Sequence, residues 1–255
     1  MSLEIEPNEN NKLIAKIYGD DKKDIFIREP QFNFDEGKEK LKGCKKIVLN
    51  NPKSYIFPTI KDVDNERIYV AGKSGSGKTY HFIRPYIKQF LNKFKSRVFY
   101  FSSKPEDRAI DDLKIIRVPV DENTEFDIKY FTNEGKKNLI IFDDIQDYPT
   151  KNINKLVARF RDEVLRNGRS LGIYTIYVNH KPNAGFDTAE QIFESTAVVM
   201  FPKQAGFNDY DRMMTQYLGI KNSDVKILKN ARSKYVYVSK SQPAYAVTDN
   251  YVLVL

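Results

Sequence analysis

A glycine-rich stretch between residues 72 and 79 constrains the fold of this chain more than any other feature. It consists of Gly72, Lys73, Ser74, Gly75, Ser76, Gly77, Lys78 and Thr79, and it fits the phosphate-loop pattern G-x-x-x-x-G-K-[ST] without a gap. Residues 67–71 predict a short buried strand just before it, and apolar residues at helical spacing follow over 82–91. This order of strand, glycine loop and helix distinguishes a phosphate loop from a chance glycine-rich turn.

The residue types in this loop suit the binding of a nucleoside triphosphate. Glycines let successive backbone N–H groups turn inward toward phosphate oxygens, and the start of the following helix adds partial positive charge. We expect Lys78 to reach the β- and γ-phosphates of ATP and the Thr79 hydroxyl to bind Mg²⁺. Pro85 falls inside the expected helix, where it should kink the helix or remove a hydrogen bond.

The composition fits a soluble globular protein of one large α/β domain or two small ones. The chain has 255 residues, of which 41% are hydrophobic and 30% charged. We expect no transmembrane segment and no signal peptide, because the apolar runs are short and residues 1–11 are polar. Cys44 is the only cysteine, which excludes an internal disulfide. The net charge of +8 permits an anionic partner such as nucleic acid, although solubility explains it equally well.

A second stretch, residues 138–144, ends in two aspartates. Residues 139–142 predict a buried parallel strand, so Asp143 and Asp144 should emerge at its carboxyl end, where ligands bind in open α/β sheets. We expect Asp143 to hold Mg²⁺, directly or through water. Asp144 should orient the attacking water and accept its proton. Two aspartates at a strand end are common, but their pairing with an upstream phosphate loop indicates a hydrolytic nucleotide site.

A helix and another strand follow. Residues 149–167 predict a helix with Pro149 in its first turn and Gly168 at its end. Residues 171–178 predict a buried strand that ends at Asn179 and His180, either of which can sense the γ-phosphate or hold the water. An ordinary loop histidine is an equal alternative for His180. The helix also carries basic residues away from its apolar face, which indicate solvation or a DNA-facing stripe: Lys151, Lys155, Arg159, Arg161 and Arg166.

The two ends of the chain predict additional β-structure. Residues 1–65 should form a β-rich extension packed on the core, and residues 66–255 the main domain. The expected strands near the two ends cover 13–18, 24–27, 46–49, 197–201 and 251–255, with a hairpin of 235–238 and 244–247. Helices are expected over 207–218 and 223–229, the second capped by Ser223.

This order of motifs resembles the FtsK–HerA superfamily of DNA-pumping ATPases, and within it the genome-packaging ATPases of large DNA viruses, the poxvirus type and its relatives. The matching segments are residues 72–79, 139–144 and 167–178, and the resemblance covers about 66–201. It implies a P-loop NTPase fold, with a mostly parallel sheet flanked by helices and β-rich additions at both ends. The family often has Gln at the strand end where Asn179 and His180 stand here.

The resemblance also implies a mechanism and partners. Arg169, or in reserve Arg166, would reach the nucleotide of a neighbouring subunit and stabilise charge on the transferred phosphoryl group. A homo-oligomeric ring, hexamer or pentamer, would use ATP and Mg²⁺ to drive double-stranded DNA into a preformed viral capsid. Capsid or membrane-associated vertex proteins would be further partners, and the location would be the assembly site in the host cytoplasm, with the virion as a second place.

Two other functions use the same loop. A P-loop kinase or another nucleotide-dependent nucleic-acid enzyme is the first, but a kinase needs a lid, and the sequence has no arginine-rich lid motif. A non-catalytic nucleotide switch or scaffold is the second. Asp144 argues against it, because a protein that only binds nucleotide has little use for a second carboxylate at that strand end.

Overall fold

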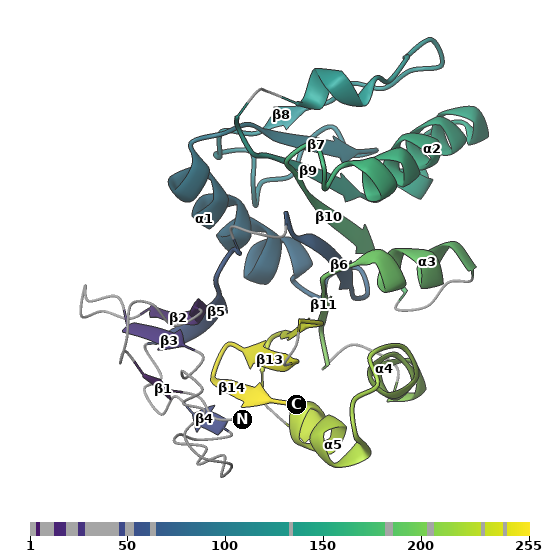
Figure 1. Cartoon of the computed structure of the whole chain (residues 1–255). Helices are drawn as coiled ribbons and strands as arrows, with labels where there is room; N and C mark the ends of the chain where they lie inside the picture. Colours follow the sequence, from purple (N-terminus) through teal and green to yellow (C-terminus); the bar gives the residue numbers. More distant parts are fainter. Residues whose placement is uncertain are drawn as a thin grey trace.

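A ten-stranded sheet forms the centre of the described part of the chain (Figure 1). The computed structural model describes residues 4–5, 13–18, 25–28, 46–48, 54–61, 65–132, 135–181, 186–202, 207–230, 233–241 and 244–255. In spatial order the strands are β4 (Lys46–Val48), β14 (Tyr251–Val254), β13 (Tyr245–Thr248), β12 (Val236–Ser239), β11 (Ala197–Met200), β6 (Arg67–Ala71), β10 (Ile173–Asn179), β9 (Asn138–Asp143), β7 (Val98–Ser102) and β8 (Ile116–Arg117).

The half of this sheet that carries the predicted motifs is parallel. Strands β11, β6, β10, β9, β7 and β8 run in one direction, whereas β12, β13, β14 and β4 add antiparallel pairs. The register pairs Asn179 with Ala71, and Asp143 with both Val178 and Ser102. Four neighbouring strands therefore end together at one edge of the sheet, as parallel strands in an α/β fold should.

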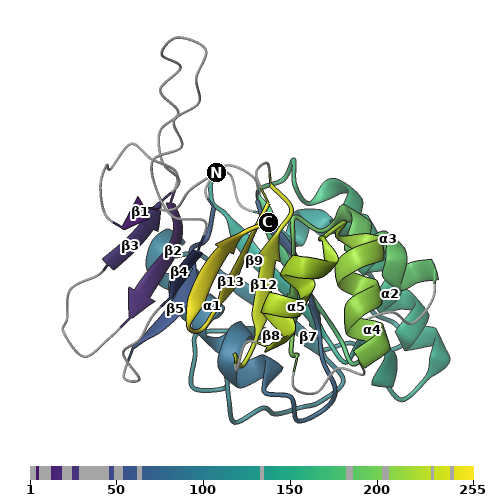
Figure 2. The ribbon, with the colours of Figure 1, turned by 90° about the horizontal axis from the view of Figure 1, so that it is seen from below.

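Helices cover both faces of the sheet. They are the π-helical turn η1 (Thr79–Ile83), α1 (Arg84–Phe94), α2 (Lys151–Asn167), α3 (Phe186–Glu194), α4 (Phe207–Arg212), the π-helical turn η4 (Met213–Tyr217) and α5 (Asn222–Asn230), with short 3₁₀ turns at Ile128–Phe131 and Ile145–Asp147. Helix α1 lies on one face and α2 and α3 on the other (Figure 1). Figure 2 shows α2, α3, α4 and α5 gathered on the same side.

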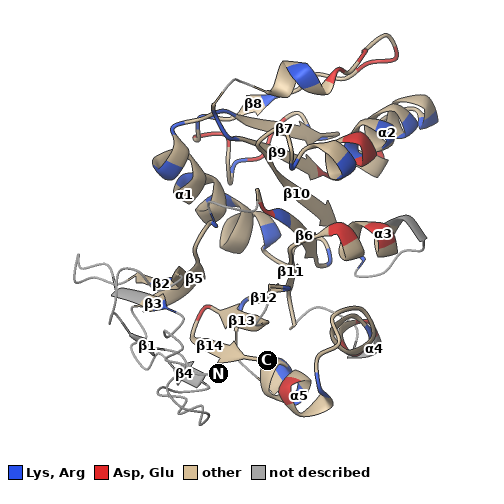
Figure 3. Cartoon of the chain, viewed as in Figure 1, with Lys and Arg blue, Asp and Glu red and all other residues tan. Residues whose placement is uncertain are grey.

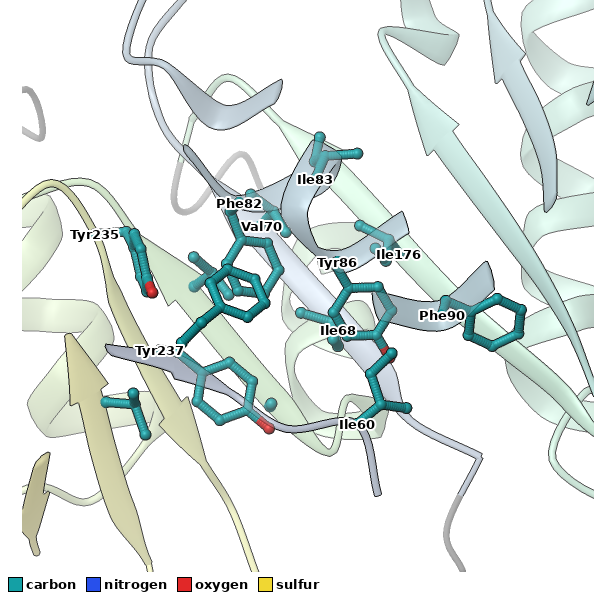
Figure 4. Packing of buried hydrophobic residues seen from close by; sticks show 14 of the residues in the cluster. Ile60, Ile68, Val70, Phe82, Ile83, Tyr86, Phe90, Ile176, Tyr235 and Tyr237 are labelled. Atoms are coloured by element: carbon teal, nitrogen blue, oxygen red, sulfur yellow. The ribbon is translucent and has the colours of Figure 1, made fainter. Parts of the chain in front are cut away.

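The alternation of side chains along β6 explains this arrangement. Ile68 and Val70 belong to the core under η1 and α1, whereas Tyr69 and Ala71 belong to the core under the other helices. A strand buried on both faces must be apolar throughout, and the strand is, from Ile68 to Ala71. Figure 4 shows aromatic side chains of η1, α1 and β12 packed over Ile68 and Val70.

The N-terminal residues contribute to two sheets. Strands β1 (Glu4–Ile5), β3 (Ile25–Arg28), β2 (Leu13–Tyr18) and β5 (Tyr55–Pro58) form a second, antiparallel sheet, and β4 joins the edge of the central one. Phe57 of β5 packs on Phe82 of η1, with ring centroids 5.4 Å apart. The predicted fold class, a mostly parallel sheet flanked by helices with β-rich additions at both ends, is confirmed.

Three helix starts differ from the predictions. The predicted helix begins as the π-helical turn η1 and continues directly into α1, so Pro85 lies where the two kinds of helix meet. Thr150 caps α2 by accepting a bond from the Ile153 N–H at 3.3 Å, so Pro149 lies before the helix. Helix α5 begins at Asn222, and Ser223 is therefore inside it. Strand β5 and helix α3 were not predicted.

Among the described residues, no helix has the length and apolar character needed to cross a membrane.

Candidate active site

The phosphate loop leaves β6 at the edge of the sheet where the parallel strands end. The Gly72 N–H donates to the Asn179 carbonyl at 3.1 Å, which ties the start of the loop to the end of β10. Gly75 and Gly77 have φ values of +73° and +86°, which only glycine adopts without strain. A Cβ on Gly77 would lie 2.5 Å from the His81 ring, so a larger residue would also displace that side chain.

Lys78 stands near the end of this loop, and its side chain turns back to the first loop residues. Its side chain is buried, and Nζ donates to the carbonyls of Gly72 at 2.7 Å and Lys73 at 3.2 Å. Nζ is also 3.2 Å from His180 Nδ1. Burial lowers the pKa of Lys78, and the charges of Asp143 and Asp144 oppose that shift. The lysine predicted to bind phosphate is therefore next to both predicted carboxylates.

Asp143 and Asp144 end β9 in different surroundings. Asp143 is buried, and its Oδ2 accepts a hydrogen bond from the Tyr100 hydroxyl at 2.5 Å. Asp144 has a left-handed backbone, φ +53°, forms an ion pair with Lys104 and contacts Nε2 of His180. The turn at Asp144 thus directs its carboxylate toward two cationic or protonatable groups.

These surroundings move the pKa values of the two carboxyls in opposite directions. Burial raises the pKa of Asp143, and the neighbouring charge of Asp144 raises it further. Burial also favours a higher pKa for Asp144, but the bond from Lys104 and the charges of His180, Lys104 and Lys78 hold it below its usual value. Asp144 is therefore ionised at neutral pH. A cation bound beside Asp143 would stabilise the ionised form of that carboxyl.

The residues present fit Mg²⁺. Thr79 and Asp143 offer hydroxyl and carboxylate oxygens, the ligand types that Mg²⁺ prefers. A divalent cation beside Asp143 would offset the burial and repulsion that raise its pKa. Asp144, Asp147 and His180 also each place one ligand atom within 4.8 Å of the others. The loop side of the site fits phosphate: within the described residues, the buried Ser76 Oγ has no hydrogen-bond partner.

The end of β10 separates two residues that the sequence left as alternatives. His180 contacts both Lys78 and Asp144. The Asn179 side chain instead donates to Gln191 of α3 at 3.0 Å. His180 therefore lies with Lys78 and Asp144, and Asn179 connects β10 to α3.

Sequence reasoning missed Tyr100 and Lys104. Both come from β7 and the turn after it, and β7 pairs directly with β9, with Ser102 beside Asp143. The sequence does show polar residues just after the strand at 97–101. Their closeness to Asp143 and Asp144 depends on the strand order, which the sequence does not state.

Arg169 and Arg166 lie far from this site. Both are exposed and precede β10, whereas the phosphate loop lies beyond its end. Seven residues of extended strand separate the two edges by roughly 20 Å. The Arg169 carbonyl accepts a bond from Asn65 at 2.7 Å, and its side chain borders a cavity of about 310 Å³ with Arg67, Glu194 and Lys240. Neither arginine can reach the phosphate loop of its own chain.

Comparisons with known proteins give one relative in sequence and several similar structures. No family model matches the chain. An uncharacterized protein, V3, of Sputnik virophage is 27% identical over 248 residues, which is 95% of each chain. The genome packaging NTPase B204 of Sulfolobus turreted icosahedral virus 2, solved with ATP-gammaS, is 15% identical, with a TM-score of 0.48 over 73% of this chain and 98% of its own.

The conjugation coupling protein TcpA of pCW3 is 14% identical, with a TM-score of 0.44 over 96% of this chain and 77% of its own. The order of the motifs and the mostly parallel sheet that carries them agree with the resemblance to the FtsK–HerA ATPases that the sequence shows.

Proposed function

We propose that this protein is an ATPase that drives double-stranded DNA into a preformed viral capsid. One observation carries the proposal: Lys78 of the ungapped phosphate loop meets Asp144 and His180 at the carboxyl edge of the sheet. This grouping supports hydrolysis as well as nucleotide binding, because a carboxylate held ionised beside the loop can orient a water molecule.

Each residue has a role in this proposal. Backbone N–H groups of the loop and Lys78 bind the β- and γ-phosphates, and Thr79 and Asp143 would hold Mg²⁺, which neutralises phosphate charge when bound. Asp144 orients the attacking water and accepts its proton. His180 takes the sensor role, which the sequence left open between it and Asn179.

Lys104 controls the basicity of Asp144. The ion pair with Lys104 helps to keep the pKa of Asp144 low, and a carboxylate with a low pKa is a weak proton acceptor. Most of the Lys104 side chain is exposed, at 58%, so it is free to move toward an anion. We expect a bound γ-phosphate to draw Lys104 from Asp144 and so to make Asp144 a stronger base.

Arg169 acts between subunits in this proposal, with Arg166 in reserve. Its place at the opposite edge of the sheet supports action on a neighbour's nucleotide, because its own loop is out of reach. Such an arrangement requires a closed ring, a pentamer or hexamer, in which each subunit's arginine edge faces the next subunit's loop edge.

The DNA and capsid partners rest on the resemblance and on charge. Helix α2 carries exposed Lys151, Lys155, Arg159 and Arg166, which Figure 3 shows as blue segments along the helix. The relative in a virophage supports a viral setting. We propose capsid or membrane-associated vertex proteins as further partners. The proposed location is the assembly site in the host cytoplasm, and also the virion. We also propose that residues 1–65 are an extension of a single ATPase domain, 66–255.

The test is the ATP hydrolysis rate of the full chain as double-stranded DNA is added, with a sizing measurement on the same sample. We expect DNA to raise the rate several-fold in a ring-sized species. Hydrolysis that DNA leaves unchanged, in a species that remains monomeric, contradicts the translocase and leaves a simple nucleotide hydrolase. Phosphate transfer to a small-molecule acceptor would instead favour the kinase alternative.

A further inference from the structure

A cleft of about 690 Å³ opens beside the phosphate loop, and none of the residues assigned above lies in it. One wall is formed by η1 and α1, and a second by β2 and β5 of the smaller sheet. The third wall is formed by residues beside β12 and at the turn between β13 and β14. Its size is in the range of sites that enclose a small organic ligand. The side chains used below are Tyr18, Tyr55, Tyr80, His81, Lys234 and Asp249.

The cleft begins at Tyr80 and His81, the two residues that follow the phosphate loop. The His81 N–H donates to the Gly77 carbonyl at 2.8 Å, and its ring lies against Gly77. Tyr80 directly follows Thr79 and meets the His81 ring edge-on, with centroids 5.1 Å apart. A triphosphate on the loop amides carries its nucleoside beyond the α-phosphate, and the first turn of the helix borders that side.

The walls offer flat aromatic faces and polar groups. Tyr80 is 65% exposed and Tyr55 is 44% exposed, and Tyr55 stacks on Tyr18 with centroids 5.2 Å apart. Opposite them, Lys234 is exposed, and its backbone N–H donates to Asp249 Oδ1 at 3.1 Å. A nucleoside needs an aromatic surface for its base and donors and acceptors for its edges.

We propose that this cleft holds the nucleoside of the bound triphosphate, with its base stacked on Tyr80. The assignment rests on the proposed function, since it requires the phosphates to occupy the loop. A single nucleic-acid strand is the other ligand that tyrosines and lysines accommodate. Two observations favour the nucleoside. The His81 ring, which lines the cleft, lies against Gly77 of the loop. Two basic lining residues already have partners in the protein, Arg84 with Asp112 and Lys93 with the Ile60 carbonyl.

The experiment compares ligands with and without a nucleoside on the full chain. Binding of a non-hydrolysable ATP analogue and of inorganic tripolyphosphate is measured for wild type, Tyr80→Ala and Tyr80→Phe. Tyr130→Ala removes an aromatic ring of similar exposure, 73%, from a 3₁₀ turn outside the cleft, and it is the matched control. Lys234→Gln tests the cleft from a different wall, should Tyr80→Ala fail to fold.

We expect Tyr80→Ala to weaken the ATP analogue about tenfold, the loss of one stacked base, and to leave tripolyphosphate within about twofold. Tyr80→Phe and Tyr130→Ala should match wild type, and Lys234→Gln should weaken only the analogue, by about threefold. An unchanged analogue affinity in Tyr80→Ala overturns the assignment, and so does an equal loss for both ligands, which would make Tyr80 a support of the loop.

Two further outcomes separate this assignment from the proposed function. If Tyr80→Ala loses affinity for single-stranded DNA and keeps it for the analogue, the cleft belongs to a nucleic-acid strand and the assignment fails. If wild type binds neither the analogue nor tripolyphosphate, the phosphate-loop function itself is wrong and the cleft assignment falls with it.

Discussion

The two ends of β6 both lie next to buried charge, but they satisfy it differently. Just before the strand, Glu66 is 1% exposed and accepts hydrogen bonds from the hydroxyls of Tyr86 and Tyr237, each at 2.9 Å. Both tyrosines are fixed in the aromatic core (Figure 4). Just after the strand, the loop leads to Lys78 and Asp144, whose partners are other charged or protonatable side chains.

The difference shows which kind of buried charge marks a functional site. Burial raises the pKa of Glu66, and the charge of Lys61 together with bonds from the two tyrosine hydroxyls and the Lys61 backbone opposes that shift. The side chains that bond to Glu66 are hydroxyls fixed in the core. Asp144 has its pKa held low by Lys104 and His180, and Lys104 reaches solvent. An exposed lysine such as Lys104 can leave its carboxylate when an anion binds, whereas the buried tyrosine hydroxyls that bond to Glu66 stay in place.

The largest expected effect is on the phosphate loop at the end of β6. Lys78→Ala should remove detectable ATP binding and with it hydrolysis, because the loop loses its only buried cation among the described residues. The melting temperature should change little, since within the described part of the chain Lys78 bonds to loop carbonyls and His180 alone. Calorimetric titration with ATP and a thermal melt check both, with exposed Lys114→Ala as the control. Retained ATP affinity in Lys78→Ala would remove the loop from its role.

The next effect tests the opposite edge of the sheet. Arg169→Ala should lower hydrolysis roughly 10³-fold and leave ATP binding intact, because such an arginine stabilises charge only in the transition state. When the variant is mixed into wild type, the hydrolysis rate should fall more steeply than the fraction of wild-type subunits. The rate is measured against the mixing ratio. A linear fall with the fraction of variant contradicts action between subunits, and the same experiment on Arg166→Ala identifies the reserve candidate.

A smaller effect tests the partner of Asp144. Lys104→Met should lower hydrolysis at neutral pH by roughly three- to tenfold, because the γ-phosphate loses the ammonium group that it would draw from Asp144, and Lys104→Arg should retain most of the rate. Because Lys104 lowers the pKa of Asp144 in the protein without nucleotide, its loss should raise that pKa and move the acid limb of the kcat/KM profile, which reports the free protein, toward higher pH. An acid limb in the same place for Lys104→Met and wild type shows that Lys104 does not set the charge of Asp144.

The smallest effect compares the two carboxyls whose pKa values burial raises. A pKa raised on folding means stability that is present at low pH and lost as the pH rises through the folded value. Asp143→Asn and Glu66→Gln should therefore raise the melting temperature at pH 8, by roughly 2–4 °C for Asp143→Asn, and the gain should vanish near pH 4. Only Asp143→Asn should weaken Mg²⁺-dependent ATP binding. A lower melting temperature in Asp143→Asn at pH 8 contradicts the account.

The sequence predicted the elements whose signals are local. The loop at 72–79, the apolar strand before Asp143 and the strand before Asn179 are each bounded by glycine or polar residues, and all lie where expected. Strand β5 is short and contains proline, and its pairing with β2 spans nearly forty residues, so no local pattern indicates it.

The site required information that the sequence does not hold. Tyr100 and Lys104 reach the aspartates only because β7 lies beside β9, and strand order is a property of the whole fold. Asn179 and His180 are consecutive, and which of two adjacent side chains faces the site depends on the direction in which the chain leaves the strand. The role of Arg169 remains a prediction.

The central claim is that Asp144 acts on the water that attacks a triphosphate held by the loop. The most direct test measures ATP affinity and hydrolysis on the same sample of Asp144→Asn and wild type. The account predicts an affinity within about threefold of wild type and a rate lowered by at least about 10²-fold, as for loss of a catalytic base. Equal rates in the two proteins would contradict it.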